Sequence, residues 1–205
     1  RSLRRQRQMC IRDRAHTNPY LGICGLERLE QCADANRVLE TLLLDDQHRD
    51  RRQFHLIDHQ GRTACWTGPD CGEWAGHRHG QDCSVAGNFL GGESVLLAMD
   101  VAFQTSDPSW KLGRRLMHAL QAGEAAGGDR RAVSSTSAAL QISGDAAFPL
   151  LDLRVDYNNQ AVGELMAIYE RSQDLWAQQW RDELSELRTL NRTVQRSYER
   201  PRSVS

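Results

Sequence analysis

Residues 52–66, RQFHLIDHQGRTACW, carry the pattern that decides the fold class. Two short runs that contain apolar residues, Phe54–Ile57 and Thr63–Trp66, flank a polar turn with a glycine at Gly61. Runs of this kind around a glycine-containing turn are typical of a β-hairpin. We therefore expect two antiparallel strands in this stretch.

The sequence on either side of the hairpin has different patterns. Before it, apolar residues recur at helical spacing from Gly22 to about Asp46, which predicts one helix. After it, residues 67–92 contain seven of the chain's 16 glycines. We expect loops there, with one short strand near Cys83–Ala86.

The second half of the chain returns to regular patterns. Helices are expected over Glu93–Thr105 and Ser109–Ala126, followed by strands over Ser134–Ser143 and Leu150–Tyr157. A long helix is expected from Gln160 to about Leu190. Helices that bracket groups of antiparallel strands predict an α+β fold built in layers rather than alternating βαβ units.

The two ends of the chain differ from the rest. Residues 1–15 are rich in arginine and show no helical or strand period, so we interpret them as a non-native, artefactual basic segment, with a basic arm or targeting tail as the alternative. Residues 16–190 form the predicted domain, which would begin without its own start. Residues 191–205 are predicted to be a polar tail.

Composition excludes several classes of function. The chain has 26 Lys+Arg against 27 Asp+Glu, a formal net charge of -1, which disfavours a nucleic-acid partner. No apolar run is long enough to span a membrane, so no membrane partner is expected. Six cysteines in a chain of 205 residues do not suggest a disulfide framework. A cytoplasmic location is the default, and secretion stays open.

A run of cysteines and histidines invites comparison with a zinc site. Thiolates and imidazoles are zinc ligands, but the spacing lacks the usual Cys-x2–4-Cys and His-x3–5-His pairs. We therefore expect no metal and no cofactor. The residues concerned are Cys65, Cys71, His77, His79 and Cys83.

Two short motifs could contribute to a reaction. Gly127–Arg131 places an aspartate beside two arginines directly after a predicted helix, and Gly87-Asn88 follows a predicted strand. The first could hold a substrate through bidentate contacts, or it could be a helix end with a solvated ion pair. The Asn88 amide could stabilise an oxyanion, or Asn88 could simply occupy a left-handed turn.

Five short motifs occur in a fixed order along the chain. They are WAGH at 74–77, GNFL at 87–90, AGEAAGGDRR at 122–131, SAA at 137–139 and DLRVD at 152–156. This ordered set resembles one bacterial family, called domain of unknown function 1028. The resemblance covers about residues 16–180, although Ala132-Val133 and the longer connection to Ser137 depart from the family pattern.

The resemblance implies a place in the N-terminal-nucleophile (Ntn) hydrolase superfamily. It implies an αββα four-layer sandwich, here without its N-terminal strands, and cleavage of a small amide or peptide-like substrate by an N-terminal nucleophile that this fragment lacks. The fragment itself would then be inactive. A non-catalytic Ntn-fold scaffold or assembly protein is the alternative, and a zinc-binding interaction module is a third class.

The same resemblance suggests roles for individual residues. Asn88, Asp129 and Arg131 are the candidate catalytic residues. The candidate substrate-binding residues are His77, Gly87, Gly128 and Ser137.

The last predicted helix carries Trp176 and Trp180, four residues apart. Such a pair either faces the core or forms a contact between copies in a homo-oligomer.

Overall fold

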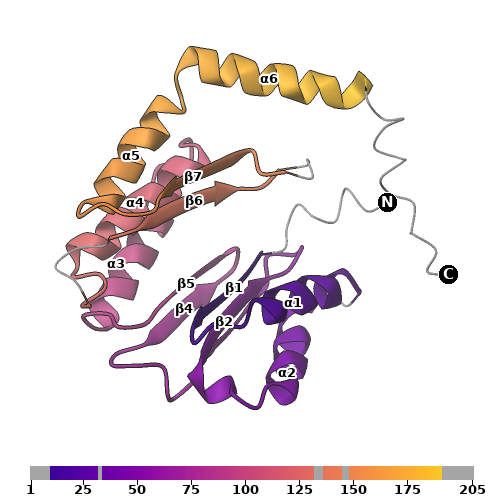
Figure 1. Ribbon diagram of the computed structural model, residues 1–205, viewed down its shortest axis with the longest axis vertical. Coiled ribbons are helices and arrows are strands. Elements are labelled where there is room, and N and C mark those ends of the chain that lie inside the picture. The colour runs from indigo at the N-terminus through magenta and orange to yellow at the C-terminus, as the bar shows by residue number, and fades with distance from the viewer. Residues whose placement is uncertain (1–9, 32–33, 132–135, 145–147, 191–205) are drawn as a thin grey trace. The chain divides into compact units, whose positions relative to one another are not determined.

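The computed structural model describes residues 10–31, 34–131, 136–144 and 148–190 (Figure 1). The chain divides into two compact units, Arg1–Met166 and Ala167–Ser205. Helices combine with small antiparallel sheets, so the expected α+β class is confirmed. Residues 1–9 and the predicted tail at 191–205 lie outside the described residues.

The described elements follow one another along the chain in this order. The strands are β1 (Cys10–Ala15), β2 (Arg52–Ile57), β3 (Thr63–Thr67), β4 (Gly76–Gly80), β5 (Cys83–Gly87), β6 (Ala138–Ile142) and β7 (Leu151–Val155). The helices are α1 (Pro19–Gln31), α2 (Ala35–Asp45), α3 (Glu93–Gln104), α4 (Leu112–Ala125), α5 (Ala161–Arg171) and α6 (Leu175–Leu190), with a short 3-10 helix at Arg49–Arg51.

The predicted hairpin is confirmed as β2 and β3, which pair antiparallel with Phe54 opposite Trp66. A third strand, β1, pairs with the other edge of β2. Sequence reasoning had placed Cys10–Ala15 in a non-native, artefactual segment at residues 1–15, because its arginines hide any alternation of apolar and polar residues. Backbone pairing with β2 does not require apolar side chains, so this segment belongs to the sheet.

The region from Gly22 to Asp46 forms two helices where one was expected. Asp34 separates them, because its side chain accepts hydrogen bonds from the backbone N–H groups of Asn36 and Arg37 at 3.0 and 3.2 Å. This is the usual N-terminal cap of a new helix. Both helices pack on the sheet β1–β2–β3 and share a core with it, made of Leu29, Ala35, Val38, Leu39, Leu42, Phe54, Leu56 and Ala64.

The glycine-rich region contains a second hairpin, β4–β5, where only one strand near Cys83–Ala86 was expected. The sequence of β4, GHRHG, has no apolar residue, so its strand character comes from pairing with β5. Helix α3 packs on β4 and β5, and α3 also packs along α4. The two helices confirm the prediction, although α4 begins at Leu112 rather than Ser109.

A polar layer, here called the sheet interface, joins β2–β3 to β4–β5. The side chain of Gln53 is fully buried, and its Nε2 donates to the carbonyls of Gly76 and Gly87, both at 2.9 Å. The hydroxyl of Thr67 lies 2.8 Å from Nδ1 of His77. Because side chains alternate along β2, Phe54 and Leu56 face the helices while Gln53 faces β4–β5.

The remaining strands, β6 and β7, pair antiparallel, as the patterns at 134–143 and 150–157 predicted, although the described strands are shorter. Residues 134–135 lie outside the described part of the chain. Helix α4 contacts β6, so the hairpin lies beside the end of α4.

The long helix expected from Gln160 to Leu190 is interrupted between Arg171 and Leu175. The hydroxyl of Ser172 donates to the carbonyl of Tyr169, and the carbonyl of Asp174 accepts from Ala177, so α5 ends and α6 starts anew. On α6, Trp176 and Trp180 are 68% and 59% exposed, so the core-facing alternative is wrong. None of the described helices combines the length and the apolar character needed to cross a membrane.

Candidate active site

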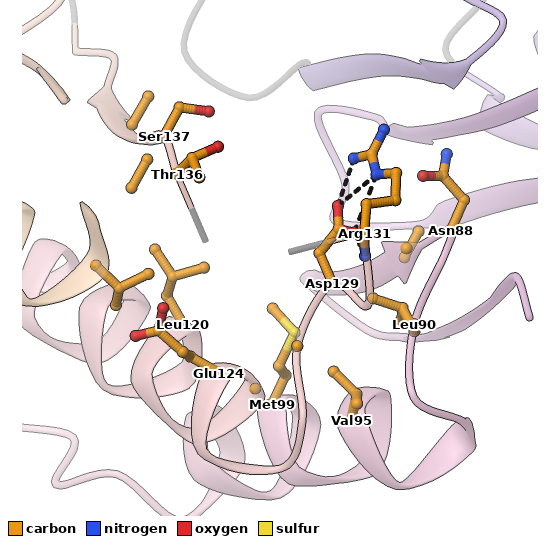
Figure 2. Close-up of a pocket in the computed structure, with 17 residues that line it drawn as sticks. Asn88, Leu90, Val95, Met99, Leu120, Glu124, Asp129, Arg131, Thr136 and Ser137 are labelled. Carbon is orange, nitrogen blue, oxygen red and sulfur yellow. Dashed lines mark hydrogen bonds and ion pairs between the residues drawn. The ribbon is translucent and has the colours of Figure 1, made fainter. Parts of the chain in front are cut away.

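A cavity of about 690 Å³ opens beside the turns that follow β5 and α4 (Figure 2). Four parts of the first unit supply most of its lining: residues 86–90, the facing sides of α3 and α4, the turn 128–131, and residues 136–139. Of the seven residues predicted to catalyse or bind substrate, six line this cavity: Gly87, Asn88, Gly128, Asp129, Arg131 and Ser137.

The backbone holds the turns after β5 and α4 together. The N–H of Arg130 donates to the carbonyl of Phe89 at 2.7 Å, and the N–H of Gly91 donates to the carbonyl of Gly128 at 3.3 Å. A single antiparallel bridge links Leu90 and Asp129. The relative positions of Asn88 and Asp129 therefore depend on backbone pairing and not on flexible side chains.

The turn after α4 needs its two glycines. Gly127 and Gly128 have φ angles of 115° and 44°, which favour glycine, and their N–H groups donate to the carbonyls of Glu124 and Gly123, both at 3.0 Å. Gly127-Gly128 thus ends the helix as the sequence predicted. The turn carries Asp129 directly to the cavity.

Asp129 and Arg131 form a bidentate ion pair (Figure 2). Nε of Arg131 donates to both carboxylate oxygens of Asp129 at 3.0 Å, and Nη2 also donates to Oδ2. The guanidinium lies over the ring of Phe89, 4.8 Å from its centroid. The hydrogen bond to Asp129 raises the pKa of Arg131 further, so this side chain stays cationic.

Asn88 lines the cavity, and its side-chain amide is available for hydrogen bonding to a ligand. Within the described part of the lining, its side chain makes no hydrogen bond to another lining residue (Figure 2). The following residue, Phe89, has a φ of 55°, a strained value for a non-glycine residue. An amide N–H held at a strained turn is suited to donate to an oxygen of a ligand.

Thr136 and Ser137 line the cavity just before β6 begins. The carbonyl of Thr136 accepts from the N–H of Asn158 at 3.0 Å, which ties this segment to the residues after β7. Ser137 thereby adds a hydroxyl to the lining.

His77 is the predicted site residue that does not line the cavity. It lies on β4 in the sheet interface, bonded to Thr67 and 5.8 Å from the ring centroid of His79. Burial, and secondarily the charge of His79, lowers the pKa of His77. The structure therefore gives His77 a contact between sheets rather than one with the cavity.

The cysteine and histidine residues considered as zinc ligands make other contacts. Sγ of Cys71 donates to the carbonyl of Arg52 at 3.2 Å, while Cys65 contacts Ser84 in the sheet interface. Burial, then the charge of Asp100, raises the pKa of Cys83 to about 11. No group of three or more His, Cys, Asp or Glu side chains within the described ranges is placed to bind a metal ion.

Among the charged residues of the lining, Glu124 is the one that sequence reasoning missed. Glu124 lies on α4 and reaches the cavity near Leu120 (Figure 2). It stood inside the quoted segment 122–131, but a glutamate on a helix is normally solvated, so nothing distinguished it. Its position four residues before Gly128, at the helix end, was the available signal.

Comparison with known proteins agrees with the motif order. The model of a family of unknown function, DUF1028, matches residues 5–165. The chain belongs to this family. The matched range includes the residues that line the cavity and also β1.

A solved structure supports the same assignment. The crystal structure of protein SPO2555 from Silicibacter pomeroyi, which carries the DUF1028 family assignment, is similar with a TM-score of 0.69 and 29% sequence identity. The similarity covers 81% of this chain and 72% of that chain. A search of curated proteins found no match.

Proposed function

We propose that this DUF1028 protein is an Ntn-type hydrolase that cleaves an amide or peptide-like bond in the cavity. The observation that carries the proposal is the cavity lining itself. Asn88, Asp129, Arg131 and Ser137 come from three separate segments of the chain and line one cavity of about 690 Å³. Polar groups that converge in a cavity are the usual mark of a ligand site.

The packing of the elements supports the four-layer αββα arrangement that such a hydrolase would have. Helices α1 and α2 pack on β1–β2–β3, this sheet contacts β4–β5, and β4–β5 contacts α3. The cavity lies at the C-terminal end of β5, where Gly87 and Asn88 leave the sheet.

The proposed reaction divides the chemistry between two parts of the protein. The nucleophile is the hydroxyl or thiol of a mature N-terminal Thr, Ser or Cys outside this chain. It attacks the carbonyl carbon, its proton passes through the free α-amine to the leaving amine, and the C–N bond breaks. Water then cleaves the acyl-enzyme, which releases the acid and regenerates the nucleophile.

The residues of this chain would stabilise the tetrahedral intermediate and orient the substrate. The Asn88 amide donates to the oxyanion of the tetrahedral intermediate, a contribution that is large for other acyl-transfer enzymes. The Asp129–Arg131 pair holds a polar group of the substrate, because a guanidinium offers more donors than one carboxylate can accept.

The test uses the protein extended to its natural start and a panel of small amides. We expect hydrolysis of at least one amide, and we expect Asn88→Ala to lower kcat/KM roughly 10²- to 10³-fold. Asn36→Ala, on the exposed side of α2, is the matched control and should be neutral. If the extended protein is folded, hydrolyses none of the amides and keeps an unprocessed start, the alternative of a non-catalytic Ntn-fold scaffold takes its place.

A further inference from the structure

The carboxylate of Glu124 is an unmatched charge in the cavity wall. Its side chain lines the cavity, and its Oε1 is shielded from solvent without a hydrogen-bond partner in the part of the chain that the structure describes. Buried polar atoms are nearly always hydrogen-bonded, and an ionised oxygen that has lost water needs a compensating donor. The described residues supply none.

The other charges of the lining cancel each other. Asp129 and Arg131 are committed to one another through their bidentate pair. Glu124 is the third charged residue among the described lining residues, so these residues together carry a net charge of -1. A cavity with this balance attracts a cation rather than an anion.

Two apolar side chains line the cavity beside Glu124. Leu120 lies one turn earlier on α4, and Met99 of α3 also faces the cavity (Figure 2). The two helices are tightly packed here, since a Cβ on Gly123 would come within 2.6 Å of Cγ of Met99. Leu120 and Met99 thus give the cavity wall beside the carboxylate an apolar surface that an aliphatic chain could contact.

We propose that Glu124 binds the protonated amine of an aliphatic ligand in this cavity. The inference rests on the proposed function in one respect: it makes the substrate an amide that carries an alkylammonium group. A primary amine of the lysine type is protonated at neutral pH and offers three donors to the carboxylate.

The test compares three probes of equal length on the full 205-residue chain: hexylamine, 1-hexanol and hexanoate. Dissociation constants come from chemical-shift titrations at pH 7. We expect hexylamine to bind on the order of tenfold more tightly than 1-hexanol, and hexanoate to bind most weakly. Glu124→Gln should reduce the preference for the amine to within about twofold. The control Glu27→Gln, at an exposed position of α1, should preserve the preference.

A second variant guards against misfolding of the first. Glu124→Asp keeps the charge and should keep the preference for the amine even if overall affinity falls. The proposal is overturned if the wild-type chain binds hexylamine no better than 1-hexanol, if it binds neither, or if a folded Glu124→Gln protein retains the full preference.

The result can be separated from that of the proposed function. Amine selectivity without amide hydrolysis in the extended protein would reject the hydrolase and keep the amine site. Hydrolysis that depends on Asn88, without amine selectivity, would reject only the amine site.

Discussion

Two arginine–aspartate pairs lie in different regions of the molecule and illustrate how differently the protein uses the same residues. In the sheet region, Nε of Arg52 donates to Asp46 at 2.8 Å, and the two side chains are 6% and 8% exposed. At the cavity, Arg131 and Asp129 make more hydrogen bonds to each other, yet their side chains are 62% and 30% exposed.

The two pairs differ in role: the first stabilises the fold, and the second is placed to contact a ligand. Arg52 also donates to the backbone carbonyl of His16, so its contacts connect the end of α2, β2 and the residues after β1. Arg131 contacts Asp129 and Phe89 within its own pair of turns and remains open to solvent. Polar groups of the sheet region are enclosed by protein, while those of the cavity remain available to a ligand.

The largest expected effect is a difference in stability loss between variants of these two pairs. Arg52→Gln should lower the free energy of unfolding by about 3–5 kcal/mol, because the charge of Asp46 is left buried without its partner. Arg131→Gln should lower it by less than about 1 kcal/mol, since the cavity pair is exposed. Urea denaturation of both variants measures this, and equal losses would remove the distinction.

A smaller loss of stability is expected at Gln53 in the sheet interface. Gln53→Met keeps the volume but deprives the carbonyls of Gly76 and Gly87 of their donor, which should cost about 2–4 kcal/mol. Urea denaturation again provides the measurement. A matched exposed change, Gln47→Met, should be nearly neutral, and a neutral Gln53→Met would show that the sheet interface does not depend on these bonds.

At Glu124, we expect a substitution to raise the free energy of unfolding rather than to lower it. Glu124→Met removes an unmatched carboxylate from apolar surroundings, so the free energy of unfolding should rise by about 1 kcal/mol while amine binding is lost. Thermal and urea denaturation, with Glu27→Met as the control, measure the change. A clear loss of stability would mean that the carboxylate has a structural partner.

The smallest effect concerns pH. Burial and His79 lower the pKa of His77 below its usual value near 6.5, so the unfolded chain binds a proton more readily than the folded one. The free energy of unfolding should therefore fall as the pH drops from 7 to 5. His77→Gln should flatten this dependence, and exposed His59→Gln should not. An unchanged slope in His77→Gln would contradict this assignment.

Local sequence signals predicted the elements whose side chains alternate or recur clearly. The β2–β3 hairpin has an apolar stripe and a glycine turn, and α3 and α4 have regular apolar spacing. Strand β1 is arginine-rich and β4 contains only glycine, histidine and arginine, so their strands depend on partners distant in sequence. The local pattern of apolar and polar residues gives no sign of such pairing.

Helix breaks were missed for a related reason. Apolar spacing continues through Asp34 and through residues 172–174, but hydrogen bonds to the backbone end one helix and begin the next at each place. Capping acts on one or two residues and leaves the periodic pattern intact. A pattern read over ten or more residues therefore joins two helices into one.

The cavity was predicted in part because its motifs are local and ordered. Gly87-Asn88 and Gly127–Arg131 are recognisable from sequence, and Gly87, Asn88, Gly128, Asp129 and Arg131 line the cavity. His77 followed the same reasoning but lies in the sheet interface, since the strand that carries it turns its side chain toward Thr67. Glu124 required the structure, because only burial distinguishes it from a solvated helical glutamate.

The most direct test of the hydrolase assignment is intact-protein mass spectrometry of the protein expressed from its natural start. The proposed mechanism predicts a mature N-terminus that is a free Thr, Ser or Cys, and a transient mass increase equal to the acyl group when an amide substrate is added. A retained initiating Met, or a mature first residue without a hydroxyl or thiol, would contradict the assignment.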